Sequence, residues 1–185
     1  MNDEYFDRIV FKRGNHLNQS GEEVCALEAW NYANTGEVTD KLPCGARKSM
    51  RCLITINDCS IWPSDKDRTE FLKPWVRRFA TLPLDPEAEQ AASFAVADYA
   101  VRTIAARRNP ELAKLAPIVD KATAAYAAAD AAYAAYAAYA AADAAYAADA
   151  AYAAAAAADA AAAYGGSFNQ YKADITRILI LLTSS

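Results

Sequence analysis

Apolar residues recur every three or four positions along most of the first 117 residues, which is the spacing of one helix face. The clearest run follows Asp85, Pro86 and Glu87, which supply an N-cap, a proline at the first helical position and an acid in the first turn. Its apolar positions are Phe94, Ala97, Val101 and either Ile104 or Ala105. No segment alternates convincingly with period two, so the pattern predicts an all-α fold, with a small β element near residues 5–12 as an open alternative.

Start and stop signals define further helices in the same region. Residues 20–23 (Ser-Gly-Glu-Glu) form a capping box, and the helix after it should end at Gly36, which suits the left-handed C′ position. A second helix is predicted over residues 45–57, and its apolar face carries Met50, Leu53 and Ile54. Ser64 should cap a third helix, which Pro74 is expected to kink or interrupt.

The composition changes sharply near Pro117. From about residue 122 to residue 163 the chain is almost only Ala, Tyr and Asp, and Ala has the highest helix propensity. We expect a helical rod on the order of 65 Å long that ends at the glycines of residues 165–166. The predicted organisation is a compact helical domain (1–117), the long Ala-rich helix (118–164) and a short C-terminal helix (165–185).

The C-terminal helix is predicted to be amphipathic, and we expect it to fold back on the core or to join an oligomer. Its apolar positions are Phe168, Tyr171, Ile175, Ile178, Leu179 and Leu182.

Tyr and Asp decorate the Ala-rich tract in steps of three or four residues. They stand at Tyr126, Asp130, Tyr133, Tyr136, Tyr139, Asp143, Tyr146, Asp149 and Tyr152. The mean step is shorter than the 3.6 residues of a helical turn, so the stripe drifts around the helix. It is either an expanded low-complexity repeat or a surface for self-association, and a homo-oligomer is therefore expected. An ice-binding surface is disfavoured, because a regular row of Thr is absent.

Charge and hydropathy narrow the class of protein. The net charge is −4, which argues against general nucleic-acid binding. The chain starts with polar residues, and the apolar run at residues 178–182 is too short to span a bilayer. We therefore expect a cytoplasmic protein without a membrane partner. Its four cysteines (Cys25, Cys44, Cys52 and Cys59) are expected to be reduced.

One group of polar residues could form a ligand or metal site. It consists of His16, Cys25, Glu28, Asp40 and Cys44, which include the usual ligand types of zinc. His16, Cys25 and Cys44 are the metal candidates, although their spacing matches no tight zinc motif. The alternative is structural: Asp40 caps a turn, Glu28 takes a helix-end or basic partner, and the cysteines belong to the core.

A second group is basic. Arg47, Lys48 and Arg51, with Asn57 and Asp58, could hold a phosphate at the N-terminus of the helix over residues 45–57. The alternative is a solvated helix face. The chain carries no glycine-rich nucleotide-binding motif, so no motif indicates a nucleotide, and the sequence leaves the cofactor unknown.

The order of these residues resembles a group of small, uncharacterised proteins from bacteriophages and actinobacteria. The resemblance covers residues 14–108, and its core is His, then Gly-x-x-x-Cys-x-x-Glu, then Asp-x-x-Pro-Cys. The matching residues are His16, Gly21, Cys25, Glu28, Asp40, Pro43, Cys44, Asn57 and Asp58, with a later segment at residues 71–76. The chain departs from the group at Thr39, where Ser is common, and in the longer Asp-to-Pro spacing. The resemblance implies a phage-related origin and an all-α fold.

These observations lead to three functional hypotheses. The first is a phage-type, non-enzymatic binding protein that counters host defence by sequestering a nucleotide immune signal or a host protein, through His16, Cys25, Glu28, Asp40 and the basic group. The second is a structural or oligomerisation protein built on the Ala-rich rod. The third is a metal- or cysteine-dependent enzyme, which ranks last.

Overall fold

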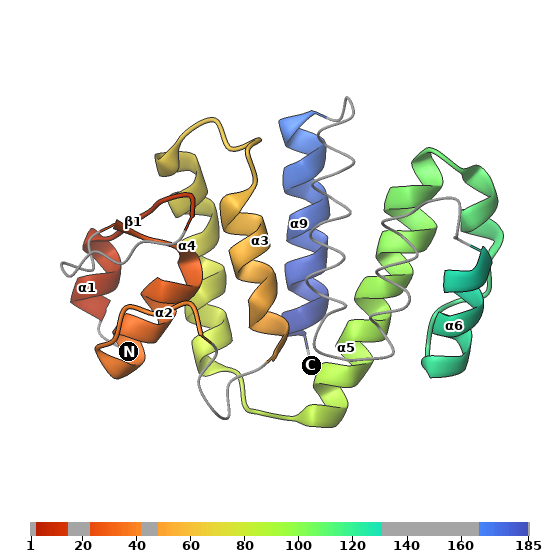
Figure 1. Ribbon diagram of the computed structural model, residues 1–185, viewed down its shortest axis with the longest axis horizontal. Coiled ribbons are helices and arrows are strands. Elements are labelled where there is room, and N and C mark those ends of the chain that lie inside the picture. The colour runs from red at the N-terminus through yellow and green to blue at the C-terminus, as the bar shows by residue number, and fades with distance from the viewer. Residues whose placement is uncertain (1–2, 15–22, 42–47, 131–166, 185) are drawn as a thin grey trace. The chain divides into compact units, whose positions relative to one another are not determined.

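The computed structural model describes residues 3–14, 23–41, 48–130 and 167–184. These residues are mainly helical, as predicted, and the chain forms two compact units, Met1–Leu84 and Asp85–Ser185 (Figure 1). The predicted domain limits at residues 117 and 164 stay a prediction, and the second of them lies outside the described residues. Within the described residues, no helix is both long enough and apolar enough to cross a membrane.

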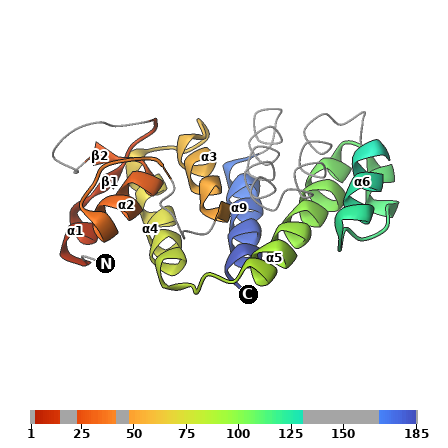
Figure 2. The ribbon, with the colours of Figure 1, turned by 60° about the horizontal axis from the view of Figure 1, so that its bottom comes forward.

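The first unit combines four α-helices with a pair of short strands among its described residues. The elements are α1 (Asp3–Arg8), β1 (Val10–Phe11), β2 (Glu23–Val24), α2 (Ala26–Thr35), the 3₁₀ turn η1 (Lys48–Arg51), α3 (Cys52–Asp58) and α4 (Asp65–Thr81). The strands pair in parallel, with Val10 opposite Glu23 and Phe11 opposite Val24 (Figure 2). The β alternative near residues 5–12 is therefore confirmed for Val10 and Phe11 alone, since α1 extends to Arg8.

The start of α2 differs from the prediction, and its end agrees. Glu23 lies in β2, so the predicted capping box at residues 20–23 does not start this helix. Cys25 is the N-cap instead. Gly36 ends the helix with φ of 79°, in the left-handed region, and its N–H donates to the carbonyl of Tyr32.

Helices α3 and α4 follow their sequence signals closely. From Lys48 onward the predicted second helix is confirmed, and Met50 and Leu53 are buried. Ser64 caps α4 by accepting a hydrogen bond from the Asp67 N–H (3.1 Å). The helix runs through Pro74 to Thr81 without the interruption that was a predicted alternative.

Polar groups of α4 hold strand β1 in the first unit. The N–H of Phe11 donates to Thr69 Oγ1 (2.8 Å), and Arg68, which is 5% exposed, donates to the Phe11 carbonyl (3.4 Å). Asp65 pairs with both Arg68 and Lys12. A two-residue strand pair is marginal by itself, so these bonds are what keep it in place.

The second unit is built on one long helical run and an antiparallel partner. The run comprises α5 (Pro86–Tyr99), a π turn η2 (Ala100–Ile104) and a 3₁₀ turn η3 (Ala105–Arg107), and η4 (Pro110–Lys114), α6 (Lys121–Asp130) and α9 (Phe168–Thr183) follow. Helix α9 lies beside α5 in the opposite direction (Figures 1 and 2). The predicted fold-back of the C-terminal helix is therefore confirmed.

The predicted start of α5 is also confirmed. Asp85 Oδ1 accepts from the N–H groups of Glu87 and Ala88, both at 3.0 Å, and Pro86 occupies the first turn. Helix α6 covers the beginning of the predicted Ala-rich rod. The rest of the rod, with its drifting Tyr stripe, lies outside the described residues.

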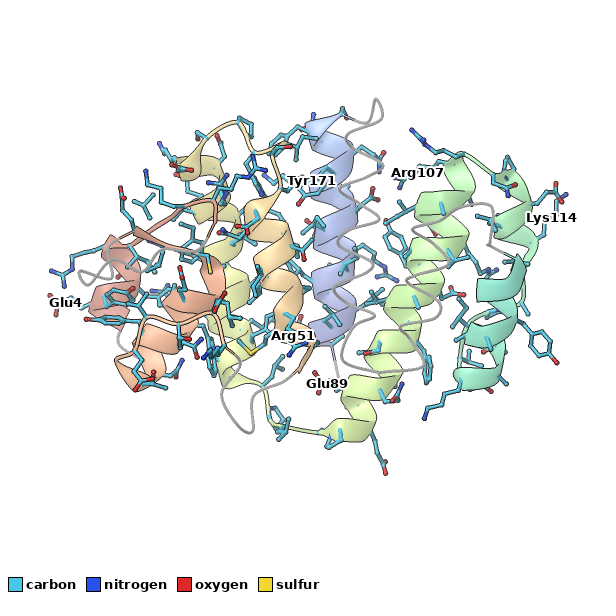
Figure 3. The ribbon with its side chains drawn as sticks, viewed as in Figure 1. Glu4, Arg51, Glu89, Arg107, Lys114 and Tyr171 are labelled. Carbon is cyan, nitrogen blue, oxygen red and sulfur yellow. The ribbon has the colours of Figure 1, made fainter. Side chains whose placement is uncertain are left out.

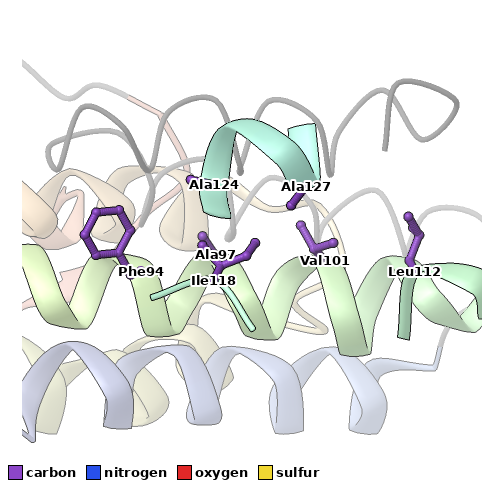
Figure 4. Packing of buried hydrophobic residues seen from close by; sticks show 7 residues of the cluster. All are labelled: Phe94, Ala97, Val101, Leu112, Ile118, Ala124 and Ala127. Atoms are coloured by element: carbon purple, nitrogen blue, oxygen red, sulfur yellow. The ribbon is translucent and has the colours of Figure 1, made fainter. Parts of the chain in front are cut away.

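A hydrophobic cluster joins α5 to α6 and to the segment between them (Figure 4). It contains Phe94, Ala97, Val101, Leu112, Ile118, Ala124 and Ala127. The small Ala side chains of α6 allow its backbone to approach α5 closely. Phe94, Ala97 and Val101 are core positions that the sequence pattern predicts.

Candidate functional site

Cys25 and Glu28, two of the predicted site residues, satisfy each other at the start of α2. The Glu28 N–H donates to Cys25 Sγ (3.4 Å), and the Cys25 N–H donates to Glu28 Oε2 (2.7 Å). This is a capping box in which a thiol replaces the usual hydroxyl. Both residues are buried, at 2% and 0% exposure. Their pairing accounts for the Cys-x-x-Glu spacing without a ligand.

The Cys25 thiol is not poised as a nucleophile. Burial raises its pKa to about 12, and the nearby Glu28 carboxylate opposes the thiolate further. Burial also raises the pKa of Cys52. Reactive cysteines depend on a lowered thiol pKa, so this environment favours the structural interpretation of both residues.

Asp40 lies on a loop that is anchored away from Cys25. The side-chain amide of Asn31 donates to the carbonyls of Thr39 and Lys41, the residues on either side of Asp40. Asn31 follows Cys25 by six residues, about 9 Å along the helix axis. Across the described part of the chain, no group of three or more His, Cys, Asp and Glu residues could hold a metal ion. His16 and Cys44 lie outside that part.

Of the predicted basic group (Arg47, Lys48 and Arg51), the structure describes the side chain of Arg51. Arg51 is exposed at the end of η1 (Figure 3). Lys48 begins the same turn, and Arg47 lies outside the described residues. The predicted anion site at residues 47–51 therefore stays a prediction.

Asn57 and Asp58, which belong to the resemblance, fix the segment after β1. Asp58 Oδ1 accepts from the Gly14 N–H (2.8 Å), and the Asn57 amide donates to the Lys12 carbonyl (2.6 Å). Gly14 has φ of 89°, a conformation that favours glycine. The pair thus has a structural task at the end of α3.

A cavity of about 600 Å³ lies in the second unit. Its described lining consists of Ala91, Phe94, Ala95, Asp98, Tyr99, Thr103, Pro117, Ile118, Val119, Arg177 and Leu181. The residues from α5 stand at positions i, i+3, i+4, i+7 and i+8, so they form one stripe along the helix. This volume falls in the range of small-molecule pockets.

One wall of the pocket is fixed to α5 through Asp98. Its Oδ1 accepts from the backbone N–H of Ile118 (2.9 Å) and from Arg102 Nη1 (3.2 Å). A charged acceptor makes a stronger bond to a backbone N–H than a neutral one does. The lining segment of residues 117–119 is therefore held against the helix.

The opposite wall belongs to α9, and Asp174 secures it. This carboxylate is 1% exposed and accepts two hydrogen bonds from the Arg107 guanidinium, both at 2.7 Å. The Tyr99 hydroxyl donates to it as well, at 2.8 Å. Figure 3 shows Arg107 near the end of the helical run and Tyr171 on α9. We call Tyr99, Arg107 and Asp174 the carboxylate clamp.

The pocket is apolar over most of its lining and carries a few polar groups. Tyr99 remains a proton donor because burial and its bond to Asp174 raise its pKa to about 12. Arg177 is exposed, and no carboxylate pairs with it among the described residues. An unpaired guanidinium beside apolar surface suits an organic anion.

Sequence reasoning does not single out this pocket. Two features of the sequence could have indicated it. One is the row of α5 residues that lines the pocket and ends in Asp98 and Tyr99, and the other is Asp174 within the apolar face of the C-terminal helix. A carboxylate at such a position requires a buried partner. The sequence alone does not say that Arg107 is that partner.

No family model, curated protein or solved structure matches the chain. The likeness to the phage and actinobacterial group therefore stays a prediction.

The thiol environment predicts low reactivity. In the folded protein, Cys25 and Cys52 should resist iodoacetamide at about pH 8.5, where an ordinary thiol is half ionised. Peptide mass mapping before and after unfolding measures this directly. Because the folded state holds the Cys25 proton up to about pH 12 and an unfolded thiol loses it near pH 9, stability should fall between these values. Rapid labelling of Cys25 in the native state would contradict its structural assignment.

The carboxylate clamp predicts a large stability difference between two cations. Arg107→Met keeps much of the aliphatic stem but leaves the buried Asp174 without its cation, so it should cost about 2 kcal/mol. Lys114, which Figure 3 labels, pairs with the exposed Glu111, and Lys114→Ala should cost under about 0.5 kcal/mol. Urea denaturation of the two variants tests this, and equal losses would contradict the clamp.

Proposed function

We propose that the protein is a non-enzymatic binding protein that holds a nucleotide in the pocket of its second unit. The observation that carries the proposal is the pocket beside the carboxylate clamp. It sets Arg177, which pairs with no carboxylate of the described residues, beside an aromatic and aliphatic lining. The guanidinium would take the phosphate. Phe94 and the aliphatic residues would cover the base.

The rigidity of the walls supports binding over a merely incidental hollow. Asp98 fixes the segment at Ile118, and Asp174 fixes α9, which contributes Arg177 and Leu181. A pocket that exists before the ligand arrives loses less conformational entropy when the ligand binds.

The surroundings of Cys25 support binding over cysteine chemistry. Its thiol caps a helix, and burial raises its pKa to about 12. This thiol would be the nucleophile of a cysteine-dependent enzyme, but it is hydrogen-bonded and protonated. The counter-defence purpose rests on the resemblance, and self-association rests on the Ala-rich tract. Both stay predictions.

Isothermal titration calorimetry with adenosine 5′-monophosphate (AMP) tests the proposal. We expect the wild type to bind AMP and to bind adenosine at least about tenfold more weakly, because adenosine lacks the phosphate. Arg177→Gln should weaken AMP binding by about tenfold. Lys172→Gln removes an equal charge from the same helix outside the pocket lining, and it should change the affinity less than about twofold.

A second pair of variants tests where the nucleotide binds, by adding a bulky side chain inside or outside the pocket. Ala91→Phe places a ring in the pocket lining and should abolish binding, whereas Ala173→Phe adds the same ring to an exposed position of α9 and should not. The proposal fails if no AMP binding is detected up to about 1 mM, a threshold near −4 kcal/mol. It also fails if the two Phe variants bind AMP equally well.

A further inference from the structure

The two carboxylate oxygens of Asp98 differ in how much of their hydrogen-bonding capacity is satisfied within the protein. Asp98 Oδ1 accepts two hydrogen bonds, from the Ile118 N–H and from Arg102, whereas Oδ2 lies 3.5 Å from Arg102 Nη1, at the limit of a hydrogen bond. An ionised carboxylate has about four acceptor positions. The Asp98 side chain is 30% exposed, and Asp98 lines the pocket, so Oδ2 retains capacity for a donor from a ligand.

The π turn brings a hydroxyl to the same pocket. Thr103 follows Asp98 by five residues, which in an α-helix would point about 140° away. The turn η2 is closed by a bond from the Ala105 N–H to the Ala100 carbonyl, five residues back, and so contains one more residue than an α turn. Thr103 and Asp98 both line the cavity, and single π turns inside helices are frequent at binding sites.

We infer that Asp98 and Thr103 together form a specificity subsite for the hydroxyl groups of a ribose, so that the pocket prefers ribonucleotides to 2′-deoxyribonucleotides. This inference rests on the proposed nucleotide binding. A carboxylate oxygen with spare acceptor capacity is the group that recognises ribose hydroxyls in other nucleotide sites. The Thr103 hydroxyl in the same pocket lining can donate or accept, as a diol requires.

The positions of the charged groups in the pocket agree with a phosphate at Arg177 and a ribose at Asp98. Arg177, the cation, lies on α9, and Asp98, the acceptor, lies on α5. The two groups therefore come from different helices of the pocket. A ribonucleotide carries a matching pair of features, an anionic phosphate and a neutral diol. A simple fatty acid has no donor for Asp98 and would leave the acceptor capacity of Oδ2 unused.

The decisive experiment compares AMP with 2′-deoxyadenosine 5′-monophosphate by calorimetry. We expect the wild type to prefer AMP by about tenfold, the usual effect of one hydrogen bond to a charged acceptor. Asp98→Asn keeps an Oδ1 acceptor for the Ile118 N–H and replaces Oδ2 by an amide donor. It should reduce the preference to under about threefold and change the affinity for the deoxynucleotide little.

Thr103→Val provides a second variant whose folding is secure, because Thr103 is exposed. It should also reduce the preference for AMP. Glu87→Gln, an exposed acid of the same helix outside the pocket lining, is the control and should retain the wild-type preference. Equal affinity of the wild type for the two nucleotides overturns the ribose subsite and leaves the proposed function standing. Binding of neither nucleotide overturns both.

Discussion

The second unit depends on the buried carboxylate of Asp174. Asp174 is 1% exposed, and an isolated charge at such a depth would be strongly destabilising. Arg107 and Tyr99, from the neighbouring helical run, supply three short hydrogen bonds to it. Since the bond partners are 67 and 75 residues apart in the chain, the clamp closes the unit across the whole Ala-rich tract. Apolar packing alone leaves helices free to slide, whereas a bidentate ion pair fixes one register.

The pocket follows from that register. Arg177 lies three residues after Asp174 on α9, and Tyr99 takes part in both the clamp and the pocket lining. Asp98, the residue before Tyr99, holds the other wall through the Ile118 N–H. Two adjacent residues of α5 therefore position both sides of the site. This arrangement explains how the second unit keeps its pocket open to a ligand.

Local features were predictable from the sequence, and long-range polar contacts were not. The caps at Ser64 and Asp85 and the left-handed Gly36 depend on neighbours within four residues, and all three are confirmed. The predicted start of α2 was wrong, because the sequence offers two capping boxes in this region. Ser20 and Glu23 fit the usual pattern better, but the pairing of Glu23 with Val10 in the strands leaves Cys25 as the cap.

The central claim is that the ligand of this protein lies between α5 and α9. Chemical-shift mapping of the ¹⁵N-labelled protein with AMP tests it most directly, because every amide reports separately. The account predicts shifts at residues 91–103, at Ile118 and Val119, and at residues 177–181, where the pocket lining lies. Shifts confined to the basic group around residues 48–51 would contradict it and would move the site to the first unit.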